Sequence, residues 1–126
     1  MSTFAKLLKK KRKESGLGQR SLAEKVGIHF TYLSKLENAV LPAPSADTIL
    51  RLADALKCPP DELLFAGKKF PITIKNALLA KPEAMHFFQK VSEFSLSTQE
   101  WNELLKTLDK IIARHGIRRP SSPASP

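Results

Sequence analysis

Residues 19–38 read QRSLAEKVGIHFTYLSKLEN, and this stretch decides the fold. Two helices that cross closely need a small residue at the crossing, a turn residue that tolerates positive φ, and apolar side chains on their inner faces. Ala23 and Gly27 meet the first two requirements. Apolar side chains follow helical spacing on both sides of the glycine, at Leu22, Val26, Leu33 and Leu36. The stretch therefore predicts helices over residues 19–26 and 29–37, joined by a tight turn.

The segments on either side of this pair also have helical patterns. Thr3 to Ser15 have one narrow apolar face. The proline-containing stretch 38–44 predicts a loop, after which Ser45 caps a fourth helix. A short fifth helix opens at Pro60. Strand patterns are lacking here, so we expect residues 1–68 to form an all-α domain of five short helices around one core.

The C-terminal part has its own helical signals. Two short helices are expected over residues 72–80 and 82–92. Ser97 and Glu100 then have the spacing of a capping box, which marks the start of the clearest helix in the chain. Its apolar stripe is formed by Trp101, Leu104, Leu105, Leu108, Ile111 and Ile112.

A stripe this wide must be buried against something, and a second copy of the chain is the expected partner. We therefore expect residues 69–115 to be a helical C-terminal dimerisation region. Its interface would be made by Trp101, Leu104, Leu105, Leu108 and Ile112. The Pro- and Ser-rich residues 116–126 are expected to be a disordered tail.

Positive charge is concentrated at the start of the chain. Residues 1–38 contain nine Lys/Arg and three Glu, a net charge of +6, while the whole chain carries +9. Such a concentration marks a surface for polyanions, either nucleic acid or an anionic membrane. Taken alone, the basic run of residues 9–13 is most simply a solvated helix face, and a nuclear import signal is another interpretation. Beside a helix-turn-helix it favours contacts with phosphates.

Several other classes of function find no support. The single cysteine, Cys58, cannot form an intrachain disulfide or a cysteine-based zinc site, and the three histidines lack metal-ligand spacing. No apolar run could span a membrane, and the N-terminus lacks the apolar core of a secretory signal. No nucleophile motif is present. We expect a cytoplasmic protein that is not an enzyme, with no metal and no cofactor.

These residues resemble a known family. Gln19 to Ile28 and Tyr32 to Glu37 closely resemble the Xre family of phage-repressor-like regulators, and the resemblance extends over roughly residues 4–67. It implies a five-helix repressor domain that binds double-stranded DNA sequence-specifically. It further implies a homodimer on a pseudo-palindromic operator, repression of a nearby promoter, and a bacterial, phage or mobile-element origin.

The resemblance also implies roles for single residues, because residues 28–38 match the recognition segment. The positions that face base edges are His29, Phe30, Thr31, Ser34 and Lys35. Gln19 and Asn38 match phosphate-holding positions, and Arg20, Lys9 and Lys13 would add backbone contacts. Lys35 has the chemistry to donate to guanine O6 and N7, and Thr31 to touch a thymine methyl.

Arg12 and Glu37 match a pair that forms a salt bridge between the first and third helices in relatives. This implies that Glu37 is structural and is not a catalytic acid. The sequence departs from the family pattern at Ala39, where many relatives have glycine, and in the following loop, which is one residue longer.

A second resemblance concerns the C-terminal region. Residues 65–68, residues 79–83 and the Trp101 helix resemble a subgroup of Xre regulators that works with an ImmA/IrrE-type metallopeptidase. The subgroup adds such a metallopeptidase to the expected partners. It also leaves an alternative function open, that of an antitoxin or protease-sensed switch whose main role is protein–protein interaction.

Overall fold

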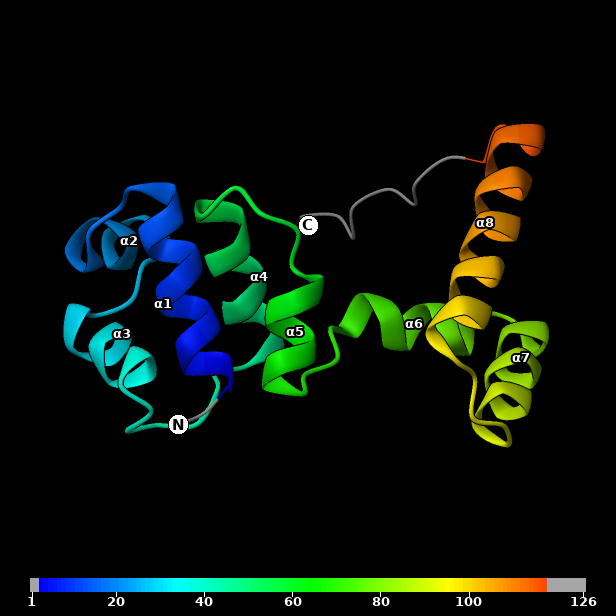
Figure 1. Cartoon of the computed structure of the whole chain (residues 1–126), viewed down its shortest axis with the longest axis horizontal. Helices are drawn as coiled ribbons and strands as arrows, with labels where there is room; N and C mark the ends of the chain where they lie inside the picture. Colours follow the sequence, from blue (N-terminus) through cyan, green and yellow to red (C-terminus); the bar gives the residue numbers. More distant parts are fainter. Residues whose placement is uncertain (1–2, 118–126) are drawn as a thin grey trace. The chain divides into compact units, whose positions relative to one another are not determined.

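The computed structural model describes residues 3–117, and every regular element in this part of the chain is an α-helix, which confirms the all-α prediction. The elements are shown in Figure 1. Their bounds are α1 (Thr3–Ser15), α2 (Gln19–Val26), α3 (Phe30–Glu37), α4 (Ala46–Ala55), α5 (Asp61–Gly67), α6 (Ile72–Ala80), α7 (Pro82–Ser92) and α8 (Thr98–His115). The chain divides into two compact units, residues 1–79 and residues 80–126.

The first unit is built around one apolar core that is shared by α1 to α5. Helix α1 packs against α3 and α5, α2 packs against α3 and α4, and α4 packs against α5. Figure 1 shows α1 between the α2–α3 pair and the α4–α5 pair. The largest fully buried apolar side chains are Leu8, Leu22, Leu33, Leu36, Ile49, Leu52 and Leu63. Burial of each contributes about 1.5–3 kcal/mol to the stability of this core.

Local chemistry sets the helix ends in this unit. Gly27 has φ 80°, and its N–H reaches the carbonyls of Ala23 and Glu24, which ends α2 and starts the tight turn. The third helix begins at Phe30, one residue later than predicted, because His29 has extended backbone and occupies the N-cap position. Ser45 caps α4 as expected, since its Oγ accepts the N–H of Thr48 at 3.3 Å.

The second unit and the adjoining α6 have equally clear helix ends. Pro82 occupies the first turn of α7. The capping box of α8 is complete, since Ser97 Oγ accepts the Glu100 N–H at 3.1 Å and Glu100 Oε1 accepts the Ser97 N–H at 2.8 Å. Yet α6, α7 and α8 contain no buried side chain. From residue 118 onward, the predicted C-terminal tail lies outside the described residues.

Candidate nucleic-acid interface

The third helix presents one row of polar side chains to solvent. Leu33, Leu36 and Glu37 are buried in the unit, whereas Thr31, Lys35 and Asn38 are exposed and Ser34 is half-buried. Positions 31, 34, 35 and 38 are spaced by three and four residues, so they share one helix face. Asn38 Nδ2 donates to Ser34 Oγ at 3.4 Å, which links two members of the row. The row combines hydroxyls, an amide and an ammonium, the groups that read base edges and phosphates.

The predicted readers His29 and Phe30 lie differently. His29 is exposed at the N-cap of α3 and makes no capping hydrogen bond through its side chain. Phe30 is half-buried and packs against the core, and the guanidinium carbon of Arg20 lies 4.3 Å from its ring centroid. One ring face is therefore covered by a cation from α2, an arrangement that sequence reasoning missed.

A buried ion pair braces the third helix. Arg12 donates from Nε to Glu37 Oε2 at 2.6 Å and from Nη2 to Oε1 at 3.0 Å. Its Nη1 donates to the carbonyl of Leu17 at 3.0 Å. The Glu37 side chain has 0% exposure and that of Arg12 has 11%. The hydrogen bond to Glu37 raises the pKa of Arg12 against the opposing effect of desolvation. The two-point contact between the guanidinium and the carboxylate fixes α3 on α1.

Gln19 joins this brace. Its Nε2 donates to Glu37 Oε1 at 3.0 Å, so one of its donors is used inside the protein. Its backbone N–H stands in the first turn of α2, behind Gly18, which offers no side-chain cap. Such a free helix N-terminus attracts phosphate oxygens. The backbone N–H and the second amide hydrogen of Gln19 are therefore the donors left for a ligand.

Arg51 of α4 supports the turn between the two helices. Its Nη1 donates to the carbonyl of Val26 at 2.8 Å, at the C-terminal end of α2, where the helix dipole favours a cation. Its Nε lies 3.5 Å from Asp47 Oδ2, one turn earlier on α4. The sequence contains no signal for the Val26 contact, because it joins residues 25 apart across the tertiary fold.

The basic run of α1 divides into structural and free cations. Lys11 Nζ donates to Glu62 of α5 at 3.0 Å, and this hydrogen bond raises the pKa of Lys11. Lys9 and Lys13 are exposed, and they surround a shallow hollow together with Lys6, Lys10 and Glu14. The two lysines expected to contact phosphates are thus accessible cations.

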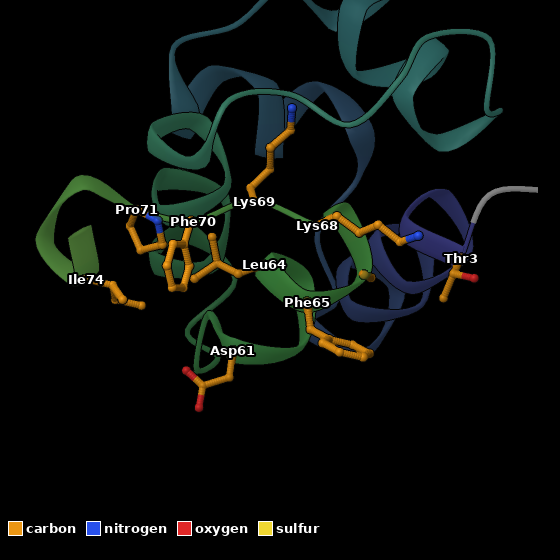
Figure 2. A pocket seen from close by; sticks show the side chains of 10 residues that line it. Thr3, Asp61, Leu64, Phe65, Lys68, Lys69, Phe70, Pro71 and Ile74 are labelled. Atoms are coloured by element: carbon orange, nitrogen blue, oxygen red, sulfur yellow. The ribbon is translucent and has the colours of Figure 1, made fainter. Parts of the chain in front are cut away.

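A second feature lies away from this face. A hollow of about 580 Å³ opens between the start of α1, α5 and the segment leading to α6. Figure 2 shows its lining, in which Phe65 and Phe70 stand on either side of Leu64 and the acidic Asp61 lies below them. Phe65 is 86% exposed, so this hollow has an apolar rim open to solvent.

Two further properties bear on the class of protein. In residues 3–117, no group of three or more His, Cys, Asp or Glu side chains could hold a metal ion. None of the helices described is both long enough and apolar enough to cross a membrane.

Comparisons with known proteins point to the same segment. Residues 8–63 match the model of a helix-turn-helix family. Over 114 residues the chain is 31% identical to the HTH-type transcriptional repressor RghR of Bacillus subtilis (strain 168), and the match covers 84% of this chain and 82% of that protein. The family match coincides with the α1–α5 core, whereas the similarity to the repressor continues into the second unit.

Proposed function

The chain belongs to the Xre-like helix-turn-helix family of DNA-binding transcriptional regulators, and we propose that it is a homodimeric repressor that binds a pseudo-palindromic operator sequence-specifically. The observation that carries the proposal is the polar row on α3 and its C-cap, in which Thr31, Lys35 and Asn38 are exposed and Ser34 is half-buried. The buried Arg12–Glu37 pair holds this row rigidly on the core. Rigid presentation matters because even a small displacement of a reading side chain removes most of its discrimination between bases.

In the proposed complex, α3 lies in the major groove and α2 crosses the backbone. Lys35 donates to a guanine edge, Thr31 contacts a thymine methyl or a base acceptor, and His29 lies at the groove entrance. Phosphates are bound by the α2 N-terminus at Gln19, by Asn38, and by Lys9 and Lys13 of α1. No catalytic step is assigned to the chain, and the proposed site of action is the cytoplasm.

We assign dimerisation to residues 69–115, with Trp101, Leu104, Leu105, Leu108 and Ile112 in the interface. Trp101, Leu105, Leu108 and Ile112 are between 40% and 55% exposed, which is unusual for an apolar helix face in a monomer. An apolar hollow lined by Phe87, Phe88 and residues of α8 adjoins this face within the second unit. A two-fold dimer formed in this way would offer two copies of α3 to the two half-sites of a pseudo-palindrome.

Selection of bound sites from a random DNA pool tests the reading role. We expect a pseudo-palindrome, and we expect Lys35→Ala to lower affinity for it by about 1–3 kcal/mol with little effect on random DNA. Lys57→Ala, which removes an exposed cation just beyond the end of α4, is the matched control. Equal losses on operator and random DNA would show that Lys35 contacts phosphate only.

Truncation tests the dimer. Residues 1–69 contain all of α1 to α5, so a fragment without residues 70–126 should fold alone but sediment as a monomer. Its operator affinity should fall by about 100-fold or more, because two linked half-site contacts become independent. A fragment that still dimerises at micromolar concentration would contradict the assigned interface.

A second candidate function gives protein contacts the main role, as in an antitoxin or a switch cut by an ImmA/IrrE-type metallopeptidase. It is favoured by the apolar hollow with the exposed Phe65 and Phe70 beside α5. A site selection that returns no preferred sequence, together with cleavage of the chain by such a peptidase, would support this candidate over operator binding.

A further inference from the structure

The three arginines of the first unit are used in different ways. Arg12 is hydrogen bonded to Glu37 and Leu17, and Arg51 is hydrogen bonded to Val26. Arg20 makes no side-chain hydrogen bond or ion pair with any residue in the described range 3–117, and its side chain contacts the Phe30 ring. It is exposed in the first turn of α2.

Stacking on an aromatic ring uses the face of a guanidinium and leaves its edges free. All five N–H donors of Arg20 therefore remain available, while the ring limits the orientations of the guanidinium plane. An arginine that is held in this way loses less side-chain entropy when it binds, since part of that cost is met in the free protein.

The position of Arg20, beside the first residue of α3, indicates which group on DNA it could bind. Phe30 is the first residue of α3, and the N-terminal residues of a recognition helix are those that meet base edges in the major groove. The stack directs Arg20 from its own helix onto this end of α3. A planar fork at this point matches O6 and N7 of guanine, the most common base contact of arginine.

We propose that Arg20 reads a guanine edge of the operator and that Phe30 is the positioning residue that orients it. The proposal rests on the sequence-specific DNA binding proposed above and changes two roles expected from the sequence. Arg20 moves from the phosphate backbone to the base edge, and Phe30 moves from direct reading to support of Arg20.

The test uses the full chain and site selection followed by titration of single base-pair variants of the selected operator. Arg20→Lys keeps the charge but lacks the planar fork. We expect it to reduce discrimination at one G·C pair in each half-site by about tenfold, with unchanged binding to random DNA. Equal weakening on all sequences, or unchanged preference at every pair, would overturn the proposal.

Phe30→Leu tests the positioning role, because leucine keeps apolar packing on the core and removes the ring. We expect Phe30→Leu to lose discrimination at the same G·C pair as Arg20→Lys. Combining the two substitutions should cause no further loss of discrimination. Phe30→Tyr, which keeps an aromatic ring, should restore it. Tyr32→Leu is the matched control, since Tyr32 is also a half-buried aromatic of α3 packed on the core, but no arginine among residues 3–117 lies on its ring. A loss at a different pair, or an equal loss in the control, would overturn the positioning role.

The two levels of the proposal fail in different ways. If the wild-type chain selects no sequence, operator binding itself is wrong and the role of Arg20 falls with it. If the wild-type chain selects an operator and Arg20→Lys retains its preference at every base pair, operator binding stands and only the role of Arg20 is wrong.

Discussion

Helices α1 to α5 and helices α6 to α8 differ in what holds them in place. Helices α1 to α5 share a core of side chains with almost no exposure, whereas α6, α7 and α8 contain no buried side chain. Both regions nevertheless have well-marked helix ends, from Gly27 and Ser45 in the first to Ser97 in the second. Local signals therefore define helices in both regions, but only the first unit converts them into a buried core.

This difference has a functional meaning within the proposed function. A unit with its own core can present a rigid reading face, since its side chains are fixed by packing. A unit with exposed Trp101, Leu105 and Leu108 gains most by burying them against a second copy. Substitutions in the two units can break or sharpen this contrast, and they follow in order of decreasing effect.

The largest effect is expected at the buried ion pair of the first unit. Glu37→Ala leaves the Arg12 guanidinium without its partner in a nearly closed site, and such a change costs about 3–5 kcal/mol. The free energy of unfolding in urea measures it. Glu62→Ala breaks the solvent-screened Lys11 pair and should have a much smaller effect on the free energy of unfolding. Similar losses in the two variants would mean that burial does not distinguish the pairs.

Replacing a leucine on the apolar face of a helix should change the free energy of unfolding by different amounts in the two units. Leu33→Ala removes a fully buried side chain and should cost about 2–5 kcal/mol of the free energy of unfolding. Leu105 is 55% exposed, so Leu105→Ala should change the free energy of unfolding of the dilute monomer by no more than about 0.5 kcal/mol.

Sedimentation at increasing concentration completes that comparison. Leu105→Ala should weaken self-association while leaving the urea midpoint of the first unit unchanged. Normal self-association of the Leu105 variant would contradict the interface that we propose.

Helix α8 depends more on its cap than any core helix does. Ser97→Ala removes one half of the capping box and should cost the helix about 1 kcal/mol, seen as a decrease in helical circular dichroism. Ser45→Ala, at the cap of the packed α4, is the matched variant and should leave helicity unchanged, because tertiary contacts keep α4 folded.

The same cap gives α8 a dependence on pH. Hydrogen bonds from Ser97, led by its backbone N–H, lower the pKa of Glu100 below its ordinary value. The folded helix therefore binds this proton less readily than the unfolded chain does. Its contribution to stability is complete above the ordinary glutamate pKa and is lost as pH falls through the lowered value. When helical circular dichroism is followed during acid titration, the wild-type chain should show this loss of stability, and Glu100→Gln should not.

The smallest effect, and one of opposite sign, is expected at Ala39. Its φ of 59° lies in the left-handed region, which costs an L-residue about 1–2 kcal/mol. Ala39→Gly should raise the free energy of unfolding by about 0.5–1 kcal/mol, because glycine removes the strain but has more freedom when unfolded. Ala55→Gly, at the last residue of α4, should instead lower it, because helical backbone gains nothing from glycine.

The departure of Ala39 from the family pattern was visible in the sequence, and so were the helix bounds. The α1, α2, α6 and α7 bounds agree with the predicted ranges because glycine stops, a first-turn proline and apolar spacing are all local properties. By contrast, α3 begins one residue later than predicted, since His29 can occupy either the N-cap or the first turn.

The partners of charged side chains were much less predictable. Within the run of residues 9–13, Lys11 is tied to Glu62 while Lys9 and Lys13 remain exposed, although composition makes them equivalent. Arg51 at the Val26 carbonyl and Arg20 over Phe30 had no signal in the sequence. The Arg12–Glu37 pair was expected only because the residues match a family pattern.

The sequence by itself thus determined the helices, the tight turn at Gly27, the basic N-terminal region and the family, because each of these depends on neighbours along the chain or on a short motif. Only the tertiary structure decided which basic side chains form ion pairs or hydrogen bonds within the protein and which remain exposed. It also placed the Arg20 guanidinium over the Phe30 ring. It further decided that, of the helices in residues 3–117, α1 to α5 form a buried core and α6 to α8 contribute no buried side chain. Those properties depend on side chains that are distant in sequence, whose meeting is fixed by packing and solvent exclusion.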